Sequence, residues 1–444
     1  MHLYTREDII RMVEEEDVEF IRLQFTDIFG NLKNMAITAS QLEKALDNRC
    51  MFDGSAIDGF VRIEESDMYL YPDYNTFEIL PFRPQQGKVA RLICDVYRPN
   101  GKPFEGDPRQ VLRTAIEYAA KVGFTMEVSP ECEFYLFDTD DLSNATNTTK
   151  EEAGFFDIGP LDFGENARRD IVMNLEDMGF VVEASHHEHS PAQHEIDFAG
   201  DEALATADNL QTFRLTVRTI AKRHGLHASF MPKPKDGVSG SGMHLNLRLK
   251  KDGVNIFGSD TDPMGLSKEA YYFIGGLMKH IKGMTAILNP LVNSYKRLVN
   301  GCDASAYIAW SATNRSPMIR IPNVAKGEEA RIELRSPDPT ANPYLSLAVI
   351  LMAGMDGIEH QIMPPKAVTG NVFHMTEEER KAAGIDILPM TLMDALDELE
   401  KDKFLCDILG NHIKTYYTAK KKEEHESYFK AVTDWEVREY LRKY

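Results

Sequence analysis

The sequence predicts an α+β fold with two domains, and three observations carry this prediction. Alternating apolar and polar residues at 18–25 and 87–97 are typical of strands. A segment rich in proline and glycine, 98–108, separates these strands from the rest of the chain. The last third of the sequence is mostly helical in pattern. We therefore expect one domain at 1–105 and a second domain at 106–444, with a helical C-terminal region.

The elements expected in the first domain follow from local signals. Thr5 followed by Asp8 is typical of a helix N-cap with an acidic first turn, and an apolar stripe follows it. Residues 18–25 alternate as a strand, and Gly30-Asn31 predicts a turn into a second strand. Residues 87–97 form a further strand. A helix is expected to begin near Pro108.

The second domain mixes strands with longer helices. Strands are expected at 134–137, 242–249 and 331–335, and helices at 165–179, 210–225 and 346–362. The charged run at 420–426 is interpreted as a solvated helix face, with no function assigned to it.

Composition limits the class of protein. With 444 residues, 43% hydrophobic and 27% charged, the chain reads as a soluble globular protein with a large core. A net charge of −20 argues against a nucleic-acid binder but not against anionic substrates. The charged N-terminus is unlike a signal peptide, and the apolar run at 345–355 is too short to span a bilayer. The five cysteines are scattered, which predicts reduced thiols in the cytoplasm.

Two carboxylates interrupt an apolar strand at Ser129–Phe137. Glu131 and Glu133 are two positions apart, so they point to the same face, roughly 6–7 Å from each other. Like charges there repel one another and cost desolvation energy. A compensating positive charge is therefore expected beside them.

Three other stretches also carry ionisable side chains on apolar strands. Each could be explained by a structural role instead of a functional one. Glu188 and Glu195 lie among histidines, but the HExxH spacing of a zinc site is lacking. A lone glutamate on a strand is more often an edge or ion-pair residue. His244 follows a glycine-rich turn and could be a satisfied core histidine. Glu333 alternates with arginines and could belong to a structural ion-pair ladder.

Taken together, these residues predict a cage of oxygen ligands for Mg²⁺ or Mn²⁺. Two divalent cations would bring four positive charges against five carboxylates. Arginines in structured contexts accompany the cage: Arg297, Arg315, Arg320, Arg331 and Arg335. Metals with convergent arginines are the equipment of phosphoryl transfer. No Walker-type or protein-kinase motif is present, so neither of those nucleotide-binding families fits.

Twelve motifs in order resemble type I glutamine synthetase across nearly the whole chain. They include MFDGSAIDGF, KPFEGDPR, PECEF, QHEIDF, GSGMHLNL, NRSPMIRIP and RIELRSPDPTANPYLSLAV. The resemblance implies an N-terminal β-grasp domain and a catalytic domain with a curved antiparallel sheet and helices. It implies a cytoplasmic homo-dodecamer with each active site between subunits. The implied reaction joins ammonia to L-glutamate at the expense of ATP, through γ-glutamyl phosphate.

The resemblance also assigns roles to residues of this chain. Two sets of three would hold the metals: Glu133, Glu188 and Glu195 beside the substrate carboxylate, and Glu131, His244 and Glu333 on the phosphate side. Glutamate would be bound by Arg297, Arg335 and the Ser239-Gly240 turn. The nucleotide and its phosphates would face Glu183, Arg248, Arg315, Arg320 and Arg331. Asp53 of a neighbouring subunit would take a proton from ammonium, and Asp303 and Arg315 complete the catalytic set.

Regulation is implied by the subtype that the chain resembles. The length and the context of Arg62 resemble the alpha subtype, which glutamine inhibits by feedback and which can bind nitrogen-regulatory proteins. The beta subtype carries an adenylylated tyrosine where this chain has Phe373, so that control is chemically impossible here.

Several positions depart from the family pattern. Phe155 replaces a tyrosine near the ammonium pocket, and Ser239 replaces an asparagine. The flap differs at Cys302, Asp303 and Ser305. Around the adenine seat, Gly200 replaces an aromatic residue and Arg248 replaces a serine. These departures keep two alternatives open: a γ-glutamyl–amine ligase for another amine, and a weakly catalytic nitrogen-sensing partner.

Overall fold

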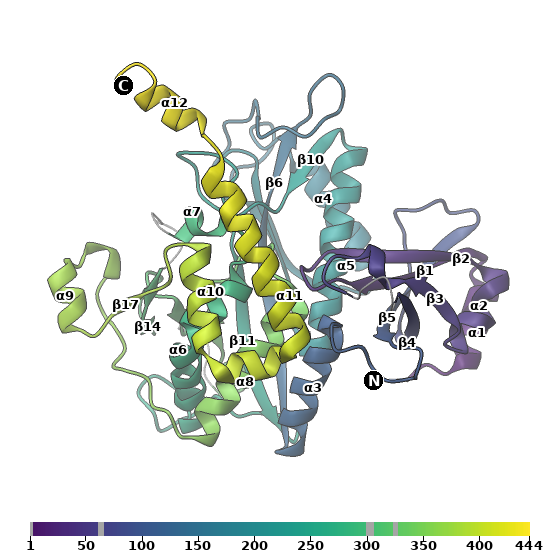
Figure 1. Cartoon of the computed structure of the whole chain (residues 1–444), viewed down its shortest axis with the longest axis horizontal. Helices are drawn as coiled ribbons and strands as arrows, with labels where there is room; N and C mark the ends of the chain where they lie inside the picture. Colours follow the sequence, from purple (N-terminus) through teal and green to yellow (C-terminus); the bar gives the residue numbers. More distant parts are fainter. Residues whose placement is uncertain (1–2, 61–65, 299–305, 323–326) are drawn as a thin grey trace.

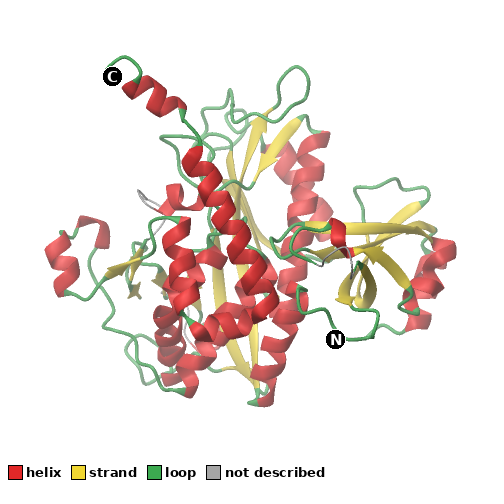
Figure 2. Ribbon diagram, viewed as in Figure 1, coloured by secondary structure: helices red, strands yellow, loops and turns green. Residues whose placement is uncertain are grey.

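The structure, a computed structural model, describes residues 3–60, 66–298, 306–322 and 327–444. Figure 1 shows two parts side by side: a small N-terminal sheet at the right, and a larger sheet whose strands run through the middle of the molecule. Helices cover the larger sheet (Figure 2). Within the described residues, no helix combines the length and the apolarity needed to cross a bilayer.

The N-terminal part is a five-stranded sheet in the order β2-β1-β5-β4-β3, with β1 and β5 parallel. Its strands are β1 (Val18–Thr26), β2 (Leu32–Thr38), β3 (Cys50–Asp53), β4 (Asp67–Ile79) and β5 (Lys88–Tyr97). Two helices and two short 3-10 turns accompany them: α1 (Arg6–Glu15), α2 (Leu42–Leu46), η1 (Ala39–Gln41) and η2 (Gly54–Ala56). The cap predicted at Thr5 is confirmed, because its side chain and that of Asp8 form a capping box.

The turn between β1 and β2 also follows the prediction. Gly30 has φ +86°, a left-handed conformation that glycine adopts without steric cost. Gln211 of the catalytic part donates from Nε2 to the Gly30 carbonyl over 3.1 Å. The hairpin is therefore tied to the second domain at its tip.

The larger sheet has ten strands and holds most of the chemistry-bearing residues. Its main path runs β14-β15-β16-β11-β6-β8-β7, with β9 and β10 on β6 and β12 on β11. The bounds are β6 (Phe124–Asp138), β7 (Val182–His187), β8 (Gln193–Phe198), β9 (Asp201–Glu202), β10 (Leu226–Ser229), β11 (Met243–Lys251), β12 (Val254–Asn255), β14 (Trp310–Ser311), β15 (Ile319–Arg320) and β16 (Ile332–Leu334). The described pairings are antiparallel except β14 with β15. A separate pair joins β13 (Tyr307–Ile308) to β17 (Asp386–Ile387).

Helices provide the rest of the catalytic part. They are α3 (Pro108–Lys121), α4 (Glu165–Glu176), α5 (Ala203–Arg223), α6 (Lys268–Leu288), α7 (Ser294–Leu298), α8 (Pro343–Glu359), α9 (Glu377–Ala382), α10 (Leu392–Lys401), α11 (Lys403–Lys430) and α12 (Asp434–Tyr440). Two 3-10 turns are η4 (Gly327–Glu329) and η5 (Val372–His374). The buried helix predicted from the apolar run is α8, in which Leu345 to Leu351 are all buried. The α+β prediction is confirmed.

One part of the sequence interpretation needs correction. The charged run at 420–426 belongs to α11, as expected for a helix, but Lys421 is only 6% exposed. Its ammonium donates to Glu424 over 2.8 Å and lies 5.6 Å from the centre of the Phe29 ring. Because the aromatic hairpin of the N-terminal part covers this position, the face is solvated only in part.

Candidate active site

Strand pairing brings the predicted carboxylates into one pocket of about 550 Å³. On β6, Glu131 lies opposite His244 of β11, and Glu133 lies opposite Glu195 of β8. Glu333 of β16 pairs with Asn246 of β11, one strand further along. Because side chains two apart share a face, these residues converge on one side of the sheet.

The first cluster consists of Glu131, His244 and Glu333. One ligand atom from each lies within 4.8 Å of the others. The Nδ1 atom of His244 lies 3.2 Å from Glu131 Oε2, and Asn246 donates to Glu131 Oε1 over 2.8 Å. Glu333 is 1% exposed. The three residues predicted for the phosphate-side metal are thus brought together.

The second cluster consists of His186, Glu188 and Glu195. Two of its members were predicted as ligands of the other metal. The third predicted ligand, Glu133, lines the same pocket but accepts hydrogen bonds from Gly242 N over 2.8 Å and Gln193 Nε2 over 3.1 Å. The pocket therefore offers two neighbouring positions for cations, each with at least two carboxylates.

The electrostatics of the pocket reflect an excess of negative charge. Burial raises the pKa of Glu195 to about 11, and the charges of Glu133 and Asp197 act in the same direction. Burial, reinforced by the charge of Glu131, raises the pKa of Asp197 to about 8. Glu131 behaves oppositely: burial opposes its ionisation, yet the hydrogen bond from His244 holds its pKa at about 2. A site that disfavours ionisation of its own carboxylates fits divalent cations.

Two arginines of the pocket pair with Glu333. Glu333 accepts from Arg320 Nη1 at one oxygen and from Arg335 Nη1 at the other, each over 2.6 Å. Arg331 donates from Nε to Asn246 Oδ1 over 3.0 Å. Asn246 in turn donates to Glu131, so its side chain connects Arg331 to the first cluster. The ion-pair ladder considered for this strand therefore exists, but it is continuous with the carboxylate cluster.

The residues predicted to hold glutamate lie around a turn beside Glu133. Arg297 is buried and donates from Nη1 to the Ser336 carbonyl over 2.9 Å. The Gly240 carbonyl accepts from Gln193 Nε2 over 3.2 Å, and Ser239 N donates to Ser190 Oγ over 2.7 Å. A side chain at Gly240 would meet the Pro232 carbonyl at 2.5 Å, so this turn requires glycine.

The residues predicted to face the nucleotide are spread more widely. Arg315 and Arg320 line the pocket, whereas Glu183 is exposed on β7. Arg248 forms ion pairs with Glu127 over 3.1 Å and with Glu329 over 3.0 Å. The guanidinium of Arg248 is therefore already engaged by carboxylates of β6 and η4.

Gly200 lies against the edge of β6. A Cβ atom added there would stand 2.9 Å from the Val128 carbonyl and would also meet the Ser129 hydroxyl. Both distances are closer than side chains adopt, so the position admits glycine alone without a backbone shift.

One predicted residue lies away from this pocket, and two others cannot be placed. Asp53 is exposed at the end of β3 in the N-terminal sheet and is not among the described residues lining this pocket. Its carboxylate accepts from Ser55 N over 2.9 Å and from Ser55 Oγ over 2.6 Å, and these bonds lower its pKa. Arg62 and Asp303 lie outside the described residues, as do Cys302 and Ser305.

Sequence reasoning missed two acid–base residues of the pocket. His186 and Asp197 both line it, and His186 Nε2 lies 3.3 Å from Glu188 Oε1. The signal was present, because His186 is two residues before Glu188 and Asp197 is two after Glu195. Alternation along a strand places such pairs on one face.

Aromatic residues also line the pocket, beside the second cluster. Phe155, Phe156 and Phe373 line the pocket, with the rings of Phe155 and Phe156 4.0 Å apart. Phe155 also meets the His186 ring edge-on at 5.6 Å. Phe155, where the sequence departs from the family pattern, and Phe373 therefore border the same pocket as the two candidate metal-binding clusters.

A third, fully buried cluster supports the site from behind. It contains Glu151, Asp162, His187 and His194. Arg168 donates from Nη1 to Asp162 over 2.7 Å and lies 2.8 Å from His194 Nδ1, so a guanidinium already supplies the positive charge. His187 Nδ1 lies 2.7 Å from the Glu188 carbonyl oxygen. This contact fixes the backbone that carries Glu188.

Models of two known protein domains together match nearly the whole chain. Residues 17–99 match the family model "Glutamine synthetase, beta-Grasp domain", and residues 105–440 match "Glutamine synthetase, catalytic domain". The chain belongs to the glutamine synthetase family. The match confirms the resemblance to this family. It also confirms the expected order of the two domains, the β-grasp domain before the catalytic domain.

Close members of the glutamine synthetase family match end to end. A glutamine synthetase of Clostridium saccharobutylicum is 59% identical over 444 residues, which is 100% of both chains. One from Staphylococcus aureus strain N315 is 52% identical over 442 residues, 99% of each chain. Among solved structures, a GmaS/ADP complex has a TM-score of 0.89 at 31% identity, covering 98% of this chain and 99% of that one. Plasmodium falciparum glutamine synthetase has a TM-score of 0.88 at 27% identity, covering 99% of both.

Proposed function

We propose that this glutamine synthetase family member is an ATP-dependent glutamate–ammonia ligase that forms glutamine through γ-glutamyl phosphate. The observation that carries the proposal is the carboxylate pocket on β6, β8, β11 and β16, in a chain 59% identical over its full length to a glutamine synthetase. The chemistry requires such a site, because a γ-carboxylate is a poor electrophile until it is phosphorylated. Charge on the moving phosphoryl group must then be neutralised.

Two divalent cations, Mg²⁺ or Mn²⁺, fit the pocket. Glu131, His244 and Glu333 would hold one, and Glu133, Glu188 and Glu195 the other, with His186 and Asp197 close by. When bound, the cations would neutralise the carboxylates and polarise phosphate oxygens. The raised pKa of Glu195 supports this reading, since a cation would favour its ionised form.

Arginines would orient the two anionic substrates. Arg335 borders the pocket. Arg297 packs against Gly242 so closely that a Cβ atom added to this glycine would stand 2.6 Å from Arg297 Nη2. These residues, with Ser239 and Gly240, would bind glutamate. Arg315, Arg320 and Arg331 would face the phosphates, and Glu183 and Arg248 the nucleotide. Guanidinium groups suit both partners because they bind carboxylate and phosphate in bidentate geometry.

The nucleophile would be prepared by a neighbouring subunit. Asp53 is exposed, which leaves its carboxylate free to reach the active site of another copy, where it would accept a proton from ammonium. Asp303 would close the site as part of the flap. A site shared between subunits requires an oligomer, which we propose to be the homo-dodecamer of the family. The exposed apolar side chains of Trp435 in α12 and of Leu441 just after it support assembly through the C-terminus.

The proposal includes the alpha subtype and a cytoplasmic location. Arg62 would serve feedback inhibition by glutamine, as in the alpha subtype, and the assembled enzyme would bind a nitrogen-regulatory protein. Phe373 excludes adenylylation at its position, because phenylalanine has no hydroxyl group. The free thiols of Cys50, Cys94, Cys132 and Cys406 support a reducing cytoplasm. The segment between β5 and α3, near residue 105, would be the domain boundary.

One assay tests the activity. Phosphate release from ATP is measured with L-glutamate across a panel of amines that includes ammonium, and glutamine is measured in the same reactions. We expect the highest turnover with ammonium. Faster turnover with a larger amine would instead identify a γ-glutamyl–amine ligase. Absence of phosphate release with every amine would favour a non-catalytic nitrogen-sensing role.

A further inference from the structure

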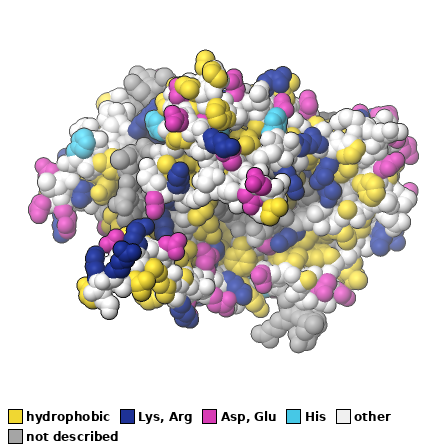
Figure 3. Space-filling view, turned by 90° about the horizontal axis from the view of Figure 1, so that it is seen from above, with side chains coloured by type: hydrophobic (Ala, Val, Ile, Leu, Met, Phe, Trp, Pro, Cys, Tyr) yellow, Lys and Arg dark blue, Asp and Glu magenta, His cyan; other side chains and the backbone are white. Residues whose placement is uncertain are grey.

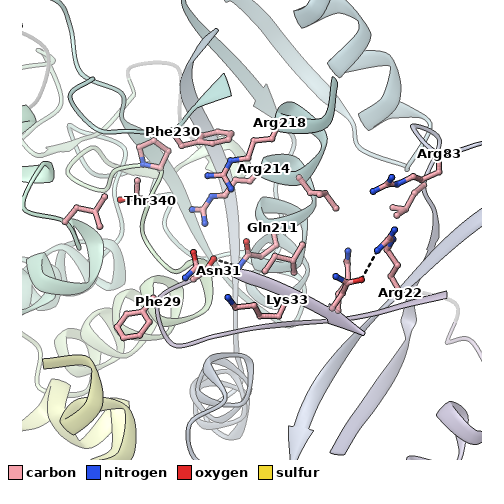
Figure 4. Close-up of a pocket in the computed structure, with 18 of the residues that line it drawn as sticks. Arg22, Phe29, Asn31, Lys33, Arg83, Gln211, Arg214, Arg218, Phe230 and Thr340 are labelled. Atoms are coloured by element: carbon pink, nitrogen blue, oxygen red, sulfur yellow. Dashed lines mark hydrogen bonds between the residues drawn. The ribbon is translucent and has the colours of Figure 1, made fainter. Parts of the chain in front are cut away.

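A second pocket, of about 560 Å³, lies between the N-terminal sheet and α5 (Figure 4). The β1–β2 hairpin and the segment after β4 form one wall, and α5 forms the other. Six lining residues are basic: Arg22, Lys33, Arg83, Arg214, Arg218 and Lys421. Within the described part of the chain, no aspartate or glutamate lines it. In a chain of net charge −20, such a pocket requires an explanation.

The α5 wall presents a stripe of polar side chains. Gln211, Arg214 and Arg218 are spaced by three and four residues, so they lie on one helix face. Arg214 is only 6% exposed; its Nη2 donates to the Ala341 carbonyl over 2.8 Å. Its Nε is buried and has no hydrogen-bond partner among the described residues. Burial lowers the pKa of Arg214 to about 10.

The opposite wall repeats this pattern. Figure 4 shows Arg22 and Arg83 next to each other at one end, and Arg214 and Arg218 together further along. The Nε atoms of Arg22 and Arg83 are also buried and lack partners in the described residues. Arg22 donates from Nη1 to Asn34 over 2.9 Å, and burial and the nearby Arg83 charge lower its pKa.

Ion pairing accounts for only two of the six cations. Lys33 lies 3.5 Å from Asp27 Oδ2, and Lys421 donates to Glu424 over 2.8 Å. The four arginines form no ion pair in the part of the chain that the structure describes; Arg218 instead lies over the Phe230 ring at 5.2 Å. By contrast, acidic and basic side chains are interspersed over the outer face in Figure 3.

Uncompensated cations at this density are costly. Like charges repel each other, and buried donors without acceptors lose the hydrogen bonds that water would provide. Four arginines that line one cavity without an ion pair among the described residues fit an anionic occupant. Guanidinium groups bind phosphate and carboxylate in bidentate geometry.

We propose that this interdomain pocket binds a small polyanion of the oligophosphate class. A dicarboxylate would neutralise two of the four unpaired arginines, whereas an oligophosphate carries enough charge for all four and has the length to reach both walls. The ligand would join the β1–β2 hairpin to α5, and so link the N-terminal sheet to the catalytic part. This site is separate from the carboxylate pocket, with which it shares no lining residue.

Binding of inorganic tripolyphosphate to the full-length assembled protein tests the proposal. Titration calorimetry in EDTA keeps divalent cations from carrying the probe into the active site. The test variant is Arg214→Gln/Arg218→Gln. Lys222→Gln, an exposed cation on the same helix, is the matched control, and Arg320→Gln reports binding at the active site. Glutarate serves as the dicarboxylate probe.

We expect saturable tripolyphosphate binding that weakens at least about tenfold in the double variant and is unchanged in Lys222→Gln and Arg320→Gln. Glutarate should bind more weakly than tripolyphosphate. Without ligand, the double variant should melt at the same temperature as the wild type or higher, because repulsion is relieved. Arg218→Gln alone serves if the double variant does not fold, since Arg218 is exposed.

Three results would overturn the proposal. Absence of saturable binding would mean that no such ligand is held, for instance because another copy of the chain covers the pocket. Loss of binding in Arg320→Gln alone would assign the probe to the active site. Equal or tighter binding of glutarate would reject the oligophosphate class.

Discussion

Glu333 shows at the residue scale how the pocket manages its charge. It is buried, holds Arg320 and Arg335 on its two oxygens, and stands 3.8 Å from His244. A cation entering the first cluster must share this carboxylate with two guanidinium groups. Glu333 is thus the point where the proposed metal site and the proposed phosphate-binding arginines meet.

Replacing the Glu333 carboxylate tests whether this residue binds a metal ion. We expect Glu333→Gln to weaken Mn²⁺ binding at least about tenfold, because an amide is a poorer ligand and leaves both arginines without a counter-charge. Calorimetric Mn²⁺ titration measures it. Glu329→Gln, an exposed change in η4, is the control. Equal Mn²⁺ affinity in Glu333→Gln and wild type would remove Glu333 from the ligand set.

Phe155 should affect the second half-reaction. It borders the pocket beside His186 but cannot donate a hydrogen bond to an incoming amine. We expect the wild type to release more phosphate than it forms glutamine, as water competes for the acyl phosphate. Phe155→Tyr should bring the ratio nearer to one, and adding Asp303→Glu should bring it nearer still.

Measuring phosphate and glutamine in the same reaction checks this expectation. Phe156→Tyr, the same chemical change at the next pocket residue, should leave the ratio as it is. Strict one-to-one stoichiometry in the wild type would show that the departure at 155 is compensated.

Alternation along strands made part of the site predictable. Glu131 and Glu133 share a face because they are two apart on β6, and that inference needs no partner strand. A shared cage with Glu195, His244 and Glu333 could be predicted from their charge on apolar strands, but which residues lie opposite each other depends on strand register, which the sequence pattern does not give. Asp197 is a different case, because it follows Glu195 by two residues on β8 and alternation alone could have found it.

At the scale of elements, one arginine links α3 to both parts of the molecule. Arg109 is 2% exposed and binds Asp73 of β4, Asp95 of β5 and Asp208 of α5, over 2.9, 2.7 and 2.7 Å. Tyr344 of α8 donates to Asp208 over 2.7 Å. The N-terminal sheet is therefore fastened to the catalytic helices by a buried, fully paired charge.

Arg109→Met should be strongly destabilising. Removing the cation leaves the buried Asp208 without an ion-pair partner among the described residues, and leaves Asp73 and Asp95 with Arg113 alone, which costs about 3–5 kcal/mol. Arg113→Met, which removes a more exposed partner of Asp73 and Asp95, should cost about 1 kcal/mol or less. Denaturant unfolding compares the two variants. Similar losses in both would mean that Arg109 stabilises the fold no more than a surface charge.

A buried carboxyl on β4 should make the stability of the N-terminal sheet depend on pH. Burial raises the pKa of Glu78 from 4.5 to about 7, with Arg91 opposing the shift. The contribution of Glu78 to the free energy of unfolding is therefore fully present below pH 4.5 and is lost as the pH rises through 7. At pH 8 the loss is at most about 3 kcal/mol.

Glu78→Gln should remove this part of the pH dependence. Thermal unfolding at pH 5 and pH 8 measures it: the difference between the two melting temperatures should shrink in Glu78→Gln and persist in Glu19→Gln, an exposed change on β1. An unaltered difference in Glu78→Gln would assign the pH dependence to other groups.

Elements with local signals were predictable, and those without were not. The Thr5 cap, the Gly30 turn and the helix start at Pro108 are confirmed in α1, β2 and α3, since each depends on a few adjacent residues. The short strands β14 and β15 have two residues each, too few for a periodic pattern, and they pair in parallel.

At the scale of the whole molecule, α12 projects away from the body (Figure 1). Phe429, Val432, Trp435 and Leu441 are 82%, 76%, 52% and 74% exposed. Isolated apolar side chains on a surface are normal, but a projecting segment this rich in them is typical of a contact with another chain. It would complement the proposed dodecamer.

Trp435→Ser/Leu441→Ser should therefore divide the assembly. We expect a smaller particle in light scattering coupled to size-exclusion chromatography, with far-UV circular dichroism unchanged because neither side chain packs in the core. Arg442→Gln, an exposed polar change in the same segment, should leave the size unaltered. A full-sized assembly in the double variant would place the contact elsewhere.

The close approach of Gly200 to β6 limits what a single substitution can add at this position. The first carbon of an aromatic side chain would stand 2.9 Å from the Val128 carbonyl, so the backbone after β8 would have to move, and Ser129 with it. In the proposed nucleotide site, other residues would therefore contact the base.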